Sequence, residues 1–162
     1  MISFARLTEI SPDLIVDHMS DPRVAEHMPL LQGQFTHAAA RAFVGAKEKR
    51  WQQDGLGHWA FLHNGDYVGW GGFQKEGDEW DYGLVLRPDA FGLGQRITRQ
   101  AFAFARAKRL TQVTFLLPPT RRSLGALQRL GAEFVGESIY SGKVFRKYRL
   151  SLLGPARGRT AT

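Results

Sequence analysis

The sequence of 162 residues contains no cysteine. Disulfide bonds, thiolate zinc ligands and a cysteine nucleophile are therefore excluded. No apolar run approaches the ~20 residues that a membrane-spanning helix needs, and residues 1–10 lack the basic and apolar segments of a signal peptide. The histidines, among them His18 and His27, show no spacing typical of a metal-ligand set. We therefore expect a cytoplasmic protein with no membrane partner and no metal.

The composition is that of a folded protein with an excess of positive charge. Hydrophobic residues make up 43% and charged residues 23%, and the net charge is +7. These values exclude a wholly disordered chain. Many of the basic residues lie after residue 120, which favours an anionic partner such as nucleic acid, an acidic protein surface or a phosphorylated cofactor. A solvated basic surface is the alternative.

The hydrophobic periodicity predicts one domain of mixed α/β (α+β) class. Ser11 and Thr36 are expected to cap helices, and Asn64-Gly65 and Ser141-Gly142 to form hairpin turns. The domain is expected to span residues 1–150, followed by a strand end and flexible tail at 151–162. Strands are expected at 2–7, 57–63, 67–74, 79–87, 113–117, 133–139 and 143–150, with helices after Ser11, Thr36, Pro88 and Thr120. This order predicts a mixed, mostly antiparallel twisted sheet flanked by helices.

The most informative stretch follows the strand at 79–87. The apolar triplet Leu84-Val85-Leu86 leads through Pro88 to Gly92 and Gly94, where a helix begins. Glycines let a ligand approach the backbone, and the N–H groups at a helix start favour an anion such as a pyrophosphate. A plain tight turn would use the same residues. The third glycine of a Rossmann fingerprint and the Gly-Lys-Ser/Thr of a Walker A loop are both missing.

This stretch resembles the acyl-CoA-binding motif of the GCN5-related N-acetyltransferase (GNAT) superfamily. In that motif, a strand with an apolar triplet leads through proline into Gln/Arg-x-x-Gly-x-Gly/Ala at a helix start. Gly94 matches the first motif glycine, whereas Phe91 and Arg96 differ from the usual residues. Phe91-Gly92 and Trp70-Gly71-Gly72-Phe73 resemble the branch that acetylates the N-termini of ribosomal proteins. The resemblance covers roughly residues 3–150.

The resemblance implies that acetyl-CoA is the acyl donor. It also implies that the motif strand and the helix start bind it, the strand holding the pantetheine arm and the loop amides holding the pyrophosphate. Thr120, which stands where the family often has asparagine, and Ser123 are the implied contacts on the following helix. The cofactor-binding residues implied in this way are Leu84, Val85, Leu86, Gly92, Leu93, Gly94, Gln95, Arg96, Ile97, Thr120 and Ser123.

Two residues are candidates for catalysis. The resemblance places Ser123 near the thioester sulfur, where it would protonate the leaving thiolate; a helix-capping role is the alternative. Asp81 matches a strand position where the family often has a carboxylate, and it is the first candidate to remove the proton of the attacking amine. A water relay is the alternative, and His58, His63 and Glu137 are lesser candidates for the base. Strand alternation puts Asp81 on one face with Val85 and puts Tyr82 on the other. An ordinary aspartate pKa of about 3.9 is low for a base unless burial raises it.

The predicted reaction transfers an acetyl group from acetyl-CoA to a primary amine, by direct attack in a ternary complex. The amine belongs to a protein N-terminus or to a small molecule, and Trp59, Trp70 and Tyr140 are candidates for lining its pocket. Two alternatives stay open: a family member that binds CoA without catalysis, and a nucleic-acid-binding module that uses the basic C-terminal surface. With an enzyme we expect no nucleic-acid partner, and a homodimer is left open.

Overall fold

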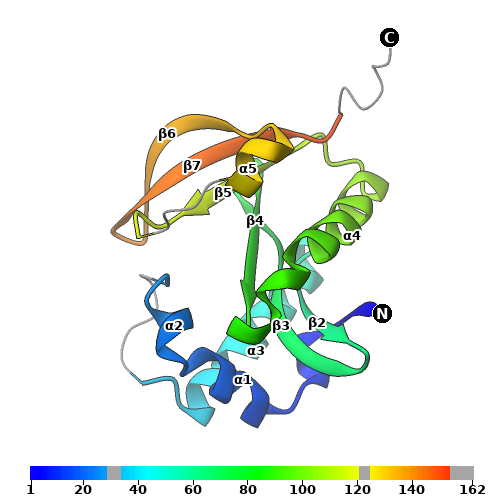
Figure 1. The fold of residues 1–162 in the computed structure, drawn as a ribbon, viewed down its shortest axis with the longest axis vertical. Helices are drawn as coiled ribbons and strands as arrows, with labels where there is room; N and C mark the ends of the chain where they lie inside the picture. Colours follow the sequence, from blue (N-terminus) through cyan, green and yellow to red (C-terminus); the bar gives the residue numbers. More distant parts are fainter. Residues whose placement is uncertain (29–33, 121–124, 154–162) are drawn as a thin grey trace.

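The computed structural model describes residues 1–28, 34–120 and 125–153. Within these residues seven strands form one sheet, in the order β1-β2-β3-β4-β5-β7-β6 (Figure 1). Neighbouring strands run antiparallel except β4 and β5, which run parallel. The strands are β1 (Ile2–Ala5), β2 (His58–His63), β3 (Asp66–Glu76), β4 (Glu79–Leu86), β5 (Gln112–Leu117), β6 (Glu133–Tyr140) and β7 (Lys143–Ser151). The expected mixed, mostly antiparallel sheet is confirmed.

Helices flank the sheet at the positions that the periodicity predicts. Ser11 and Thr36 cap their helices by accepting the N–H of Asp13 and Ala39, and Gly55 ends the long third helix with a positive φ of 77°. The α-helices are α1 (Pro12–Met19), α2 (Pro22–Ala25), α3 (His37–Asp54), α4 (Gly94–Ala107) and α5 (Gly125–Leu130), and the short 3-10 helices are η1 (Leu7–Glu9) and η2 (Pro88–Leu93). The beginning of the helix expected after Thr120 lies outside the described residues.

Both predicted hairpin turns are present. Asn64 and Gly65 have φ values of 53° and 89°, and Ser141 and Gly142 have 50° and 78°. Positive φ at both central residues is typical of the type I′ turn, whose twist matches that of the flanking strands. These turns fix the register of β2 against β3 and of β6 against β7.

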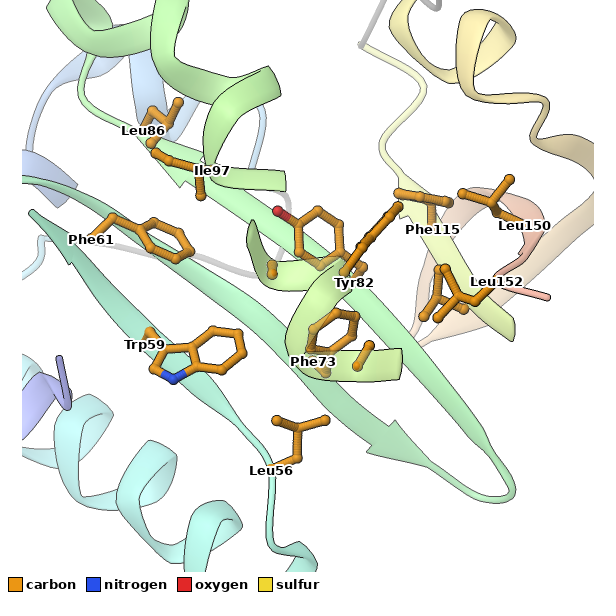
Figure 2. Close-up of a cluster of buried hydrophobic side chains, with 14 of the residues drawn as sticks. Leu56, Trp59, Phe61, Phe73, Tyr82, Leu86, Ile97, Phe115, Leu150 and Leu152 are labelled. Atoms are coloured by element: carbon orange, nitrogen blue, oxygen red, sulfur yellow. The ribbon is translucent and has the colours of Figure 1, made fainter. Parts of the chain in front are cut away.

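The sheet has a hydrophobic cluster on each face. The larger cluster lies against α4 and includes Phe61, Phe73, Tyr82, Ile97 and Phe115 (Figure 2). Burial of each large side chain stabilises the fold by about 1.5–3 kcal/mol. The smaller cluster packs β2 and β3 against α1 and α3, and Val85 lies at its margin. Strand β4 therefore directs Tyr82 to the α4 face and Val85 to the α1–α3 face, as the alternation predicts.

Candidate active site

The parallel pair β4 and β5 opens beyond one shared position. Asp81 of β4 is paired with Thr114 of β5, the one paired position described between these strands. Figure 1 shows β4 and β5 running in different directions. The next part of β4, Leu84–Leu86, keeps its antiparallel partner β3. In the part of the chain that the structure describes, no strand pairs with the other edge of Leu84–Leu86. Its backbone groups can therefore bind an extended ligand.

Ion pairs hold the other end of β4 against the sheet. Glu79, the first residue of β4, accepts a hydrogen bond from Lys147 and another, of 2.8 Å, from Arg149 Nη2. Both cations lie on β7, on the far side of β5. These contacts close the end of the sheet where β4 starts, so the two strands separate only in the direction of Leu86.

The chain leaves β4 through η2 and enters α4, and the start of this helix lies against β4. A Cβ placed on Gly94 would contact the side chains of Leu84 and Leu86 at 3.5 and 3.7 Å, and one on Gly92 would meet nothing within 4 Å. No side chain of the described residues caps the N-terminus of α4, and its first turn has no acidic residue. The N–H of Gly94 donates to Phe91 O at the end of η2. The positive end of the helix dipole meets no carboxylate in the first turn, which favours an anion there.

The two motif positions with unusual residues do not cover this helix start. Phe91 is 61% exposed, and the side chain of Arg96 is exposed in the first turn of α4. Ile97 is fully buried and fixes the helix to the core. Arg96 therefore adds positive charge beside the helix N-terminus, which fits a ligand with phosphate groups.

Asp81 stands where β4 and β5 separate, on the face that carries α1 and α3. The Thr114 hydroxyl donates a hydrogen bond of 3.3 Å to Asp81 Oδ1. The pKa of Asp81 is raised to about 8, chiefly by burial and in part by the nearby Glu76, while hydrogen bonds from Thr114 and the backbone of Leu116 oppose the shift. A carboxyl group with this pKa exchanges its proton near neutral pH. The condition that an aspartate base requires here, a raised pKa, is therefore met.

A chain of hydrogen bonds lies on the same face beside Asp81. Lys47 Nζ of α3 donates to Gln74 Oε1 (3.2 Å), and Gln74 Nε2 donates to Glu76 Oε2 (2.6 Å). The Tyr140 hydroxyl of β6 donates to the same Glu76 oxygen (3.2 Å). Gln74 is the direct cross-strand neighbour of Asp81. We call these four residues the polar chain; of them, the sequence patterns single out only Tyr140.

Burial also shifts the pKa values within the polar chain. It lowers the pKa of Lys47 to about 8, an effect that Arg50 adds to and that Glu76 and Asp81 oppose. Burial, together with Glu76, raises the pKa of the Tyr140 hydroxyl. The ammonium of Lys47 is therefore still mostly charged at pH 7, and the hydroxyl of Tyr140 is neutral.

The structure separates the two tryptophans that the sequence favours for the acceptor pocket. Trp70 lies on the same face as Asp81, where its Nε1 donates to Met19 Sδ (3.2 Å). Trp59 lies on the opposite face, in the core against Phe4 and Phe73. The structure therefore brings Trp70 and Tyr140 to the face of Asp81 and does not bring Trp59 there.

Of the other predicted residues, Gln95 is exposed on α4 and Leu93 packs against the larger cluster. The last two, Thr120 and Ser123, belong to the segment after β5. Thr120 is exposed, and its Oγ1 is 3.0 Å from His27 Nδ1. This contact joins the segment after α2 to the segment after β5. Ser123 lies outside the described residues.

A depression of about 450 Å³ lies where β4 passes into η2. Its lining comes from α1, α2 and the residues Arg87 and Pro88. Arg87 Nη2 is 2.6 Å from Asp17 Oδ2, and Arg23 is paired with Asp21 at 2.8 Å. The charges that line the depression are thus already neutralised within the chain.

The described residues offer neither a metal-binding cluster nor a membrane-spanning helix. They contain no group of three or more His, Cys, Asp or Glu side chains that could hold a metal ion. Nor does any helix among them have the length and apolar character needed to cross a membrane.

Comparison with known proteins identifies a matching family and similar folds. The acetyltransferase (GNAT) domain family matches residues 5–148, whereas no curated protein matches the chain. The structure of AAC(6')-Ib in complex with ribostamycin and coenzyme A has a TM-score of 0.77 at 13% identity, covering 100% of this chain and 98% of that one. An N-acetyltransferase from Staphylococcus aureus Mu50 has a TM-score of 0.69 at 15% identity, covering 94% and 98%. A GNAT-family acetyltransferase from Bacillus anthracis has a TM-score of 0.68 at 17% identity, covering 94% and 95%.

Proposed function

The chain belongs to the GNAT acetyltransferase family, and on this basis we propose that it transfers an acetyl group from acetyl-CoA to a primary amine. The amine attacks directly in a ternary complex of enzyme, donor and acceptor. The acetyltransferase domain is proposed to span residues 1–150; of the strand end and tail that the sequence predicts at 151–162, residues 154–162 lie outside the described residues. The acceptor is a small-molecule amine or, as in the branch that the sequence resembles, a protein N-terminus.

The observation that carries this proposal is the free edge of β4 beside the N-terminus of α4. Leu84–Leu86 would pair with the pantetheine arm through their backbone groups, and Gly92–Ile97 would surround the pyrophosphate. Bound there, acetyl-CoA supplies the acetyl group as an activated thioester. The neighbour AAC(6')-Ib was solved with both ribostamycin and coenzyme A, which supports a site for an acyl donor and an amine acceptor on this fold.

Asp81 is the proposed base. An amine attacks only in its neutral form, so a proton must first leave the acceptor's ammonium group, and the carboxylate of Asp81 accepts it. The new N–C bond then forms while the C–S bond breaks. The nitrogen loses a second proton as the amide forms, which balances the proton that the thiolate gains, while the first proton passes from Asp81 to solvent. Ser123 is proposed to donate the thiolate's proton, on the resemblance alone.

The acceptor pocket is proposed on the α1–α3 face of β4. Trp70 and Tyr140 lie on this face, and between Asp81 and Val85 the strand carries Gly83. A Cβ placed on Gly83 would meet no atom within 4 Å. This gap leaves room for an amine to approach the strand beside Asp81. Trp59 is not part of the proposed pocket, because it lies in the core on the other face.

Release of CoA tests the proposal. Purified protein is incubated with acetyl-CoA and a panel of amines that includes amino acids, N-terminal peptides, polyamines and aminoglycosides. We expect at least one amine to accelerate thiol release, with the acetylated amine detected by mass spectrometry. Asp81→Asn should slow this release. Acetyl-CoA binding without release for any amine would indicate a member that has lost catalysis.

A further inference from the structure

We propose that Lys47 binds a carboxylate of the acceptor, and that the acceptor is therefore a free amino acid whose amine lies at Asp81. This inference rests on the proposed acetyltransferase function and names the substrate class of the same site. It is carried by the surroundings of Lys47, by the charges near it and by its placement relative to Asp81.

The ammonium of Lys47 is held in a partly buried position without a direct counter-ion. It lies 5.1 Å from the centre of the Trp70 ring and 5.4 Å from that of Phe43. Its one side-chain hydrogen bond is to the neutral amide oxygen of Gln74. Among the described residues, no carboxylate forms an ion pair with it. A charge removed from water in this way is costly unless an anion compensates it.

The carboxyl groups near Lys47 favour its charged form, but none of those described binds it directly. The described hydrogen bonds of Glu76 come from two neutral donors, Gln74 and Tyr140, and Gln74 stands between Glu76 and Lys47. Asp81 is mostly protonated, and so neutral, at pH 7, because its pKa is about 8. Arg50, which is itself paired with Asp54 at 3.8 Å, adds a second positive charge close to Lys47. The missing anion therefore has to come with a ligand.

The placement of Lys47 fits an amino acid. Its hydrogen-bond partner Gln74 faces Asp81 across the β3–β4 pair, where Cβ atoms of opposite residues are about 5 Å apart. In an α-amino acid a single carbon joins the amine to the carboxylate. A carboxylate at Lys47 would thus bring the amine toward Asp81 and the open space above Gly83. A polycationic amine would instead be repelled by the ammonium of Lys47.

Matched acceptor pairs test this inference. CoA release is measured with free amino acids and with the corresponding amino acid amides, for example phenylalanine and phenylalaninamide. The amine of the amide loses its proton more easily than that of the acid, so more of the amide is present as the reactive neutral amine. Ionisation of the amine alone would therefore give the amide the higher rate. We expect kcat/KM to be at least about tenfold higher for the acid, the effect of one charge-assisted contact. Lys47→Met should remove this preference by lowering kcat/KM for the acid alone, and Lys47→Arg should restore part of it.

A control on the same helix separates this effect from a change of fold or of overall charge. Lys49 is exposed on α3, and Lys49→Met should keep the preference for the acid. Equal use of acid and amide by the wild type, or a preference unchanged in Lys47→Met, would overturn the inference and leave the acetyltransferase function standing. Preference for the amide would overturn it too and would indicate a protein N-terminus instead. Failure of the function itself would differ, because no amine would then be acetylated.

Discussion

Asp81 of β4 lies directly opposite Thr114 of β5, and the Thr114 hydroxyl donates to its carboxyl group over 3.3 Å. Beyond this pair β4 continues without β5, so the carboxyl group stands where the free strand edge begins. The same position withdraws it from water and raises its pKa to about 8. One feature of the sheet, the separation of two parallel strands, thus places the proposed base and the proposed donor site side by side.

The pH dependence of the reaction should report Asp81. Only its carboxylate form accepts a proton, so kcat/KM should rise as the pH is raised through about 8. Asp81→Asn should lower kcat/KM by about 10²–10⁴-fold and change this profile. The pH profiles of wild type and Asp81→Asn are measured with the same acceptor, so the ionisation of the acceptor affects both profiles equally. An unchanged profile in the variant would assign the rise to the acceptor rather than to Asp81.

The same residue should cost stability at alkaline pH. Its folded-state pKa of about 8 lies above the unfolded value of about 3.9. The stability that protonated Asp81 contributes to the fold is therefore fully present below pH 4 and is lost as the pH rises through 8. Asp81→Asn stays neutral at every pH. We expect this variant to be more stable than the wild type at pH 9, with a Tm higher by about 2–4 °C for each kcal/mol gained. Thermal unfolding followed by circular dichroism at pH 5 and pH 9 measures the difference.

The open space above Gly83 should be needed for acetyl transfer. Apart from its chain neighbours, a Cβ at this position would meet no described atom within 4 Å, so Gly83→Ala should fold normally. Its methyl group would project on the Asp81 face of β4 and should reduce kcat/KM at least about tenfold by displacing the amine. Gly45→Ala is the matched control, because a Cβ on this exposed glycine of α3 also meets nothing within 4 Å. If Gly83→Ala retained full activity, the acceptor would not approach over this part of the strand.

His58 should make the fold sensitive to acid. It is buried, neither ring nitrogen has a described hydrogen-bond partner, and burial holds its pKa well below the ordinary range. Since the unfolded chain takes up a proton near pH 6.5 and the folded chain does not, stability is lost as the pH falls below that value. His58→Phe should therefore shift the urea midpoint upward at pH 5 more than at pH 8. His63→Phe, on the partly exposed end of the same strand, controls for the substitution itself.

Local patterns predict much of the fold because the forces behind them are local. The caps at Ser11 and Thr36, the turn at Asn64-Gly65 and the alternation along β4 depend on a few neighbouring residues. The same alternation assigns Asp81 and Tyr82 to opposite faces of the sheet, and the two hydrophobic clusters confirm that assignment for the strand. Local patterns therefore predict the parts of the site that lie on a single strand, such as Asp81, or at a single helix end, such as the start of α4.

The polar chain could not be predicted in this way. Lys47 and Gln74 meet because α3 packs on β3, and Tyr140 reaches Glu76 because the β6–β7 hairpin returns to the same face. Such contacts depend on strand order and on the packing of α3, which no local pattern contains. Trp59 shows the same limit, since alternation tells which residues share a face but not which face carries the site.

The most direct test of the central claim, an acyl-CoA site on β4 and α4, is calorimetric titration of acetyl-CoA into the protein at moderate salt. We predict binding in the micromolar range. Gly94→Ala, whose methyl group would make ordinary contacts with Leu84 and Leu86, should bind as the wild type does, whereas Gly94→Glu should bind at least about tenfold more weakly because it adds a negative charge at the helix N-terminus. A short single-stranded oligonucleotide is titrated in parallel. No binding of acetyl-CoA, together with salt-sensitive binding of the oligonucleotide, would contradict the claim and indicate a nucleic-acid-binding surface.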